Sequence, residues 1–163
     1  MEYRYIGDLV NTHGVKGEVR ILSDSKFKKE IFVPGRILYL GKNKEPLEVE
    51  KYRVHKMYDM ITFKDIHDIN DVLIYKGDMV YINKEDVKVS GYFDEDLIGL
   101  DVIYHGEVLG KVDSILKSKA HDIISVIGSK KCLIPYVDEF IDTIDLESHK
   151  MVVQNVEGLI YED

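Results

Sequence analysis

The sequence contains a single cysteine, Cys132, which excludes an internal disulfide and any zinc site built from several cysteines of one chain. It also lacks an uninterrupted apolar run close to the roughly 20 residues that cross a bilayer. The first residues, MEYRYIGDLV, lack the basic stretch and apolar run of a signal peptide. We therefore expect a cytoplasmic protein with no membrane partner.

An excess of positive charge is missing as well. Lys and Arg total 22 and Asp and Glu total 30, which gives a formal net charge of −8. A protein that binds naked nucleic acid without sequence preference would normally be basic, because its affinity comes from neutralising phosphates. The charge is unevenly divided: residues 1–88 hold 16 basic and 15 acidic residues (net +1), whereas residues 89–163 hold 6 and 15 (net −9).

Most of the chain has the pattern of short strands, rich in Val, Ile and Tyr and separated by Gly or charged turns. In the first half the pattern predicts five strands: Tyr3–Val10, Gly17–Leu22, Arg36–Leu40, Leu47–Met57 (with a bulge) and Met60–Phe63. Two segments have helical spacing, Asp24–Val33 and Asp68–Tyr75, the second with Asp68 as its N-cap.

The second half predicts five more strands: Leu100–Tyr104, Glu107–Leu116, Asp122–Ile127, Lys131–Tyr136 and Lys150–Gln154. Two-residue hairpins are expected at His105-Gly106 and Gly128-Ser129, and Pro135 is expected at a strand end or edge. We place a domain boundary near Lys88–Gly91. The predicted fold class is mainly β: two small β-barrels, 1–88 and 92–163, joined by a short linker, with one or two short helices.

The segment Thr12–Arg20 is the first candidate site. Gly14 and Gly17 surround Lys16 between two strands, which is typical of a turn that needs positive φ. Its alternative role is a loop that contacts RNA phosphate. With the lysines just downstream it forms the densest basic patch of the sequence, either a solvated face or a modest footprint for folded rRNA; the candidate contacts are His13, Lys16, Arg20, Lys26, Lys28 and Lys29.

Tyr92-Phe93 is the second candidate site. In an extended chain the two rings point to opposite sides, so one could be core and the other exposed. The pair could pack between the domains, or it could anchor a protein partner. The acids that follow, Asp94, Glu95 and Asp96, would suit a basic partner and repel RNA.

We find no catalytic constellation, and we expect no cofactor, no metal and no enzyme activity. The six histidines lack metal-ligand spacing, no serine has a Gly-x-Ser-x-Gly setting, and no dinucleotide fingerprint is present. Cys132 lies in an apolar strand and is expected to be a small core residue. Two alternatives stay open: an RNA-processing or RNA-modifying enzyme with a β-barrel core, and a free-standing barrel that serves as an adaptor for another machine.

Several motifs together resemble one known family. Ile6-Gly7 and the run Thr12–Arg20 resemble the opening motif of the ribosome maturation factor RimM family. The second half is similar to the PRC-barrel domain of that family, over Tyr92-Phe93, Asp96–Gly99, Leu109–Val112, Ala120–Asp122, Leu133–Val137 and Glu157–Ile160. These pieces occur in the family's order and run nearly end to end.

The resemblance implies a factor that assists small-subunit assembly and rRNA processing. We expect it to act without catalysis and as a monomer. The resemblance also implies binding to the immature small ribosomal subunit and to ribosomal protein S-nineteen in its head. The family's tandem aromatics implicated in that contact correspond to Tyr92 and Phe93. Phe93 stands where the family often has a second tyrosine, so no hydroxyl is available from that ring.

Overall fold

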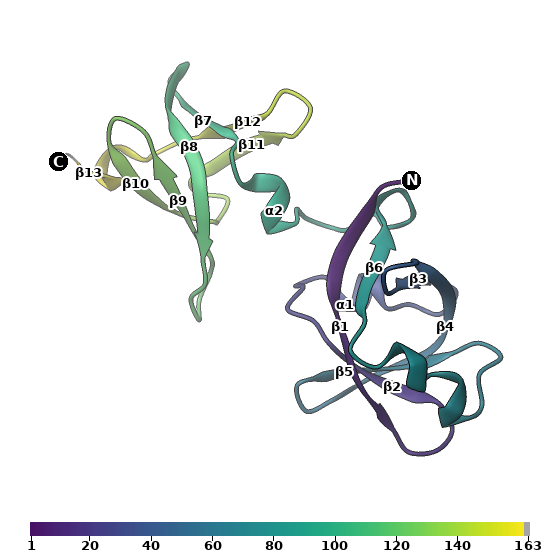
Figure 1. Ribbon diagram of the computed structural model, residues 1–163. Helices are drawn as coiled ribbons and strands as arrows, with labels where there is room; N and C mark the ends of the chain where they lie inside the picture. The colour runs from purple at the N-terminus through teal and green to yellow at the C-terminus, as the bar shows by residue number, and fades with distance from the viewer. Residues whose placement is uncertain (162–163) are drawn as a thin grey trace. The chain divides into compact units, whose positions relative to one another are not determined.

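The computed structural model describes residues 1–161 and consists mainly of β-strands, as the sequence predicts. It divides into two compact units, Met1–Gly91 and Tyr92–Asp163. Figure 1 shows the two units and labels their strands. Each unit is described separately below.

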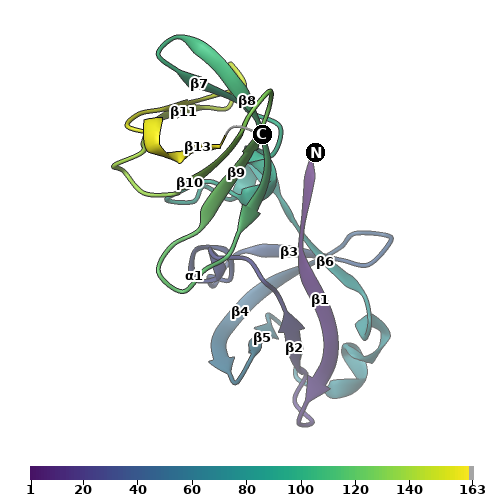
Figure 2. The ribbon, with the colours of Figure 1, turned by 90° about the vertical axis from the view of Figure 1, so that its left-hand side faces the viewer.

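The first unit is a closed barrel of six strands in the order β1-β2-β5-β4-β3-β6, and β6 pairs back with β1. In both views the strands curl around a common interior (Figures 1 and 2). Closure matters for function because a closed barrel leaves no unpaired strand edge to which another chain could add. The strands are β1 (Tyr3–His13), β2 (Glu18–Leu22), β3 (Ile37–Leu40), β4 (Glu45–His55), β5 (Tyr58–Phe63) and β6 (Met79–Asn83).

Alternating apolar residues fill the barrel interior. Val19 and Ile21 of β2 are buried, while Glu18 and Arg20 on the same strand are partly exposed. The expected bulge in β4 is confirmed by a register shift between Val49 and Lys51. The sequence prediction missed β6, whose outer face also carries large residues, so that it shows no polar alternation.

The two predicted helices are much shorter than expected. The first, α1, covers only Lys28–Ile31. The second is replaced by two 3₁₀ turns, η1 (Ile69–Asp71) and η2 (Leu73–Tyr75). Asp68 does cap η1, since its side chain accepts a hydrogen bond from the Asn70 amide at 2.8 Å. A full helix would need a buried apolar stripe, but Val72 is buried while its neighbour Leu73 is exposed.

The second unit is a seven-stranded sheet in the order β11-β12-β7-β8-β9-β10-β13, with β12 and β7 parallel. A short helix, α2 (Asp94–Leu97), precedes it. The prediction missed β11, which carries two aspartates and a threonine. The strands are β7 (Asp101–Tyr104), β8 (Glu107–Leu116), β9 (Ile123–Ile127), β10 (Lys131–Pro135), β11 (Ile141–Asp145), β12 (Lys150–Val153) and β13 (Ile160–Tyr161).

The turns of this unit largely follow the prediction. His105 and Gly106 form a two-residue hairpin with φ of 51° and 79°, as a type I′ turn requires. The β9–β10 connection has three residues, 128–130, because Ile127 pairs with Lys131, so the expected two-residue turn is wrong there. Pro135 ends β10, and Cys132 is a buried core residue, both as predicted.

Candidate functional site

The turn between β1 and β2 holds the first group of predicted site residues. A positive φ was expected at Gly14 or Gly17, and both glycines have one, 71° and 96° respectively. A Cβ at Gly17 would lie 2.8 Å from the Ile66 side chain, so glycine is also needed for close packing. The Ile69 amide donates to the Val15 carbonyl at 2.9 Å and ties the turn to η1. Lys16 is thereby held exposed at one end of the barrel.

His13 and Arg20 lie together beside this turn. Nη2 of Arg20 lies 2.8 Å from Nδ1 of His13, and its guanidinium carbon lies 5.6 Å from the centre of the Tyr58 ring. The His55 ring is 5.9 Å from the His13 ring. Sequence reasoning missed His55 and Tyr58. They pair with each other across the β4–β5 hairpin, and the pairing of β2 with β5, in which Arg20 lies opposite Met60, brings that hairpin to Arg20.

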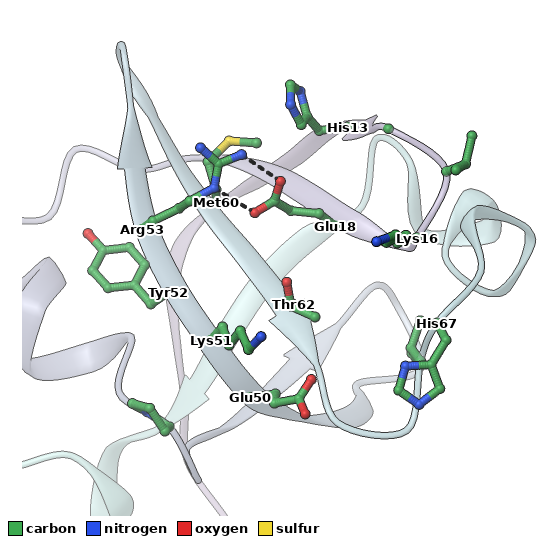
Figure 3. Close-up of a pocket in the computed structure, with 14 residues that line it drawn as sticks. His13, Lys16, Glu18, Glu50, Lys51, Tyr52, Arg53, Met60, Thr62 and His67 are labelled. Atoms are coloured by element: carbon green, nitrogen blue, oxygen red, sulfur yellow. Dashed lines mark hydrogen bonds and ion pairs between the residues drawn. The ribbon is translucent and has the colours of Figure 1, made fainter.

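A pocket of about 1010 Å³ opens next to the turn, and its charged lining comes from β1, β2, β4 and the segment after β5. Arg53 donates two hydrogen bonds to Glu18, from Nε at 2.9 Å and from Nη2 at 2.7 Å (Figure 3). The hydrogen bond from Arg53 lowers the pKa of Glu18. Burial raises this pKa by a smaller amount, so the pKa lies below its usual value. The charged and histidine lining residues are His13, Lys16, Glu18, Glu50, Lys51, Arg53 and His67.

Lys26, Lys28 and Lys29, the other predicted basic contacts, do not line this pocket. With Tyr52 they line a second, smaller pocket of about 410 Å³. Nζ of Lys28 lies 3.1 Å from Oδ2 of Asp59 in an ion pair. Nζ of Lys26 lies 5.4 Å from the centre of the Phe27 ring, and Lys29 is exposed on α1. Lys16 lines the larger pocket and these three lysines line the smaller one, so the basic residues of this stretch form two groups in space.

The aromatic pair begins the second unit. Tyr92 packs against the hydrophobic core, and its hydroxyl donates to the Ile144 carbonyl at 3.3 Å. Phe93 is half-buried and directly precedes α2. The packing of Tyr92 against the core gives this partly buried ring a structural role. The Phe93 side chain is also partly exposed.

A lysine holds the acidic helix α2 to the sheet. Nζ of Lys117 pairs with the Asp94 carboxylate and lies 3.0 Å from Oδ2 of Asp122. Burial lowers the pKa of Lys117, but hydrogen bonds to the two aspartates outweigh it and leave the pKa above its usual value. Glu95 and Asp96 continue the acidic stretch beside the aromatic pair.

Within residues 1–161 no group of three or more His, Cys, Asp or Glu side chains is arranged to hold a metal ion. None of the helices described there is long and apolar enough to cross a membrane.

Comparison with known proteins finds a matching family domain in each half of the chain. The model of the RimM N-terminal domain matches residues 5–87, and the model of the RimM PRC barrel domain matches residues 94–159. A ribosome maturation factor RimM from Staphylococcus aureus is 37% identical over 162 residues, which cover 95% of this chain and 97% of the relative. A ribosome maturation factor RimM from Exiguobacterium is 33% identical over 168 residues, which cover 98% of this chain and 98% of the relative. A crystal structure of a RimM protein from Pseudomonas aeruginosa is 24% identical, covers 94% of this chain and 97% of its own, and has a TM-score of 0.48.

The two family models and the two relatives of more than 30% identity define a ribosome maturation factor. The chain belongs to the ribosome maturation factor RimM family, which agrees with the resemblance in its sequence motifs. Membership of this family of non-catalytic assembly factors also agrees with the expectation that the chain is not an enzyme.

Proposed function

We propose that the chain acts in the cytoplasm as a monomer that binds ribosomal protein S-nineteen in the head of the immature small subunit. The second unit would make this contact, through Tyr92 and Phe93. The first unit would contact nearby rRNA, through Lys16 and its neighbours. In this mechanism binding energy alone holds protein and RNA in a productive arrangement for assembly and rRNA processing.

The division of charge is the observation that carries the proposal. The second unit has 6 basic and 15 acidic residues, net −9, whereas residues 1–88 are net +1. An acidic surface speeds the encounter with a basic ribosomal protein and repels RNA phosphate. The acids nearest the aromatic pair are Asp94, Glu95 and Asp96, so charge and aromatic surface coincide there.

The rRNA contact is supported by the end of the barrel that carries the β1–β2 turn. Lys16 is exposed there, and Lys51 and Arg53 line the same pocket. Glu18 and Glu50 offset part of this positive charge. A surface of this kind would bind weakly on its own, which suits a factor that leaves after assembly.

The test is the affinity for purified ribosomal protein S-nineteen, measured by isothermal titration. Phe93→Ala and the double variant with Tyr92→Ala should raise Kd roughly tenfold or more, because buried aromatics dominate interface energies. Tyr92→Phe removes only the hydroxyl bond to Ile144 and separates a folding defect from a binding defect. Leu146→Ala, at an exposed apolar residue of the same unit, is the matched control.

An unchanged Kd for a double variant that remains folded would overturn the assignment of the aromatic pair. The affinity should also fall as salt rises, because screening weakens attraction between exposed charges beyond about 10 Å at 0.1 M salt. An affinity that is independent of salt would contradict the electrostatic part of the proposal.

A further inference from the structure

The outer face of the first barrel carries a row of directly paired tyrosines. Tyr5 of β1 pairs with Tyr81 of β6, and Tyr81 pairs with Tyr39 of β3. The row continues to Pro46 of β4, which pairs with Tyr39. The Tyr3 ring joins the row, with its centre 5.1 Å from that of Tyr39 and 6.3 Å from that of Tyr81. We call Tyr3, Tyr5, Tyr39 and Tyr81 the tyrosine face.

The tyrosine face is open to solvent although it is largely apolar. Tyr5 is 46% exposed, and Met79, next to Tyr81 on the same side of β6, is 47% exposed. Outward aromatic pairs stabilise a sheet, which explains why they are tolerated. A contiguous exposed cluster of large apolar side chains is also the usual mark of an interaction surface.

The rings are held in defined positions. The Tyr5 hydroxyl donates to Oδ2 of Asp8 at 3.0 Å, and the Tyr81 hydroxyl donates to Sδ of Met79 at 3.3 Å. Because the barrel is closed, a partner cannot add a strand to β1 or β6 and must be recognised by side chains. Fixed rings suit such recognition, since little conformational freedom is lost on binding.

A cation already occupies part of this surface. Nζ of Lys44, in the β3–β4 turn, lies 4.1 Å from the centre of the Tyr81 ring and 5.6 Å from that of Tyr3. Ring faces attract cations, and a guanidinium stacks on them more favourably than an ammonium. The contacts of Lys44 show that the rings of this face can accept a cation.

The surrounding charge favours a cationic partner over RNA. Asp8 is bonded to Tyr5, and Asp24 and Asp86 act electrostatically on Tyr5 and Tyr39 respectively. On the basic side, Lys84 is paired with Glu2 at 3.7 Å. Nζ of Lys44 lies over the Tyr81 ring, and Lys42 of the same turn is exposed. A phosphate backbone would be repelled by this setting, although bases can stack on tyrosine.

We propose that the tyrosine face binds an extended protein segment that contains arginine or lysine. The segment would lie across β1, β6 and β3, with its cationic side chains stacked on the rings and close to the aspartates. This surface belongs to the first unit and is separate from Tyr92 and Phe93. It would give the factor a second contact with basic protein, independent of the contact proposed for the second unit.

The test uses the full chain, labelled for NMR, and a short synthetic peptide of alternating arginine and glycine. A peptide of alternating glutamate and glycine and a short oligouridine are the comparison probes. We expect the arginine peptide to shift the amide signals of Tyr3, Tyr5, Tyr39 and Tyr81. Tyr5→Ala and Tyr5→Leu should each weaken this binding roughly fivefold, because both remove the ring and Leu keeps apolar bulk.

Ile74→Ala is the matched control, since Ile74 is exposed on η2, outside the tyrosine face, and should leave the affinity unchanged. Site-specific signals also separate this binding from nonspecific attraction to the acidic second unit. The proposal is overturned if the arginine peptide leaves these signals unchanged, or if both Tyr5 variants bind it as the unaltered chain does. Oligouridine that shifts the same signals in place of the peptide would assign the surface to RNA.

Discussion

Asp59 is 1% exposed, and its Oδ2 lies 3.1 Å from Nζ of Lys28, the residue that begins α1. Its other oxygen accepts a hydrogen bond from the Tyr52 hydroxyl at 2.6 Å. Burial, and then this hydrogen bond, raise the pKa of Tyr52 well above its usual value, so Tyr52 stays a neutral donor. Lys28 therefore neutralises a buried carboxylate, and its place in the basic run has a structural explanation.

Replacing Lys28 by methionine should destabilise the first unit by about 2–3 kcal/mol, because Asp59 would remain buried without its cation. The measurement is urea unfolding followed by circular dichroism. The double change Lys28→Met with Asp59→Asn should recover part of the loss, since it removes the orphaned charge.

Lys29→Ala is the control for this prediction, because Lys29 lies on the same short helix and is exposed. It should change stability by less than about 0.5 kcal/mol. Equal effects of the Lys28 and Lys29 changes would contradict a structural role for the Lys28–Asp59 pair.

The Glu18–Arg53 pair predicts a specific pH dependence. Hydrogen bonding from Arg53 lowers the pKa of Glu18 in the folded state below the ordinary glutamate value of 4.5. The unfolded chain thus takes up the proton first as pH falls, so the contribution is present above about pH 4.5 and is lost as pH falls through the folded-state pKa. Glu18→Gln should lower the thermal midpoint at neutral pH, and the difference from the unaltered chain should shrink in acid. A difference in thermal midpoint that stays constant down to the lowest pH would contradict a stabilising role for the Glu18–Arg53 pair.

Gly110 and Gly128 face each other where β8 bulges beside the β9–β10 turn. A Cβ at Gly110 would lie 2.4 Å from the Ile127 carbonyl oxygen, and one at Gly128 would lie 2.1 Å from that of Leu109. Both obstacles are backbone atoms, so Gly110→Ala should cost about 1–3 kcal/mol of stability in the second unit. Gly158→Ala, where nothing lies within 4 Å, is the control and should be nearly neutral. Chemical unfolding of the two variants compares them, and equal midpoints would count against the close approach.

Cys132 should be unreactive in the folded protein. It is 2% exposed, and burial raises the pKa of its thiol, so little thiolate is available near neutral pH. A colorimetric thiol reagent should label it slowly in buffer and rapidly in denaturant, with glutathione as the reference thiol. Labelling of the native chain at the rate of glutathione would contradict its place in the core.

Local patterns in the sequence were enough to predict most strands, the His105-Gly106 turn and a positive φ at Gly14 or Gly17. They failed where tertiary pairing decides the outcome. β6 escaped detection because Met79 and Tyr81 give it an apolar outer face, and this is also why the tyrosine face was not foreseen. β11 escaped because acidic residues interrupt it.

The candidate sites show the same limit. His13, Lys16 and Arg20 are close in sequence, and the hairpin keeps them close in space. The pairing of Lys28 with Asp59 joins residues far apart in the chain, so no local pattern could separate Lys28 from its exposed neighbour Lys29. Resemblance of motifs supplied the family, which charge and strand pattern alone do not specify.

The central claim is that this chain acts on small ribosomal subunits before they are complete. Sedimentation of the purified protein with immature and with mature small subunits tests it most directly. The account predicts that the chain travels with the immature particles and remains largely unbound in the presence of mature ones. Equal binding to both particles, or none to either, would contradict it.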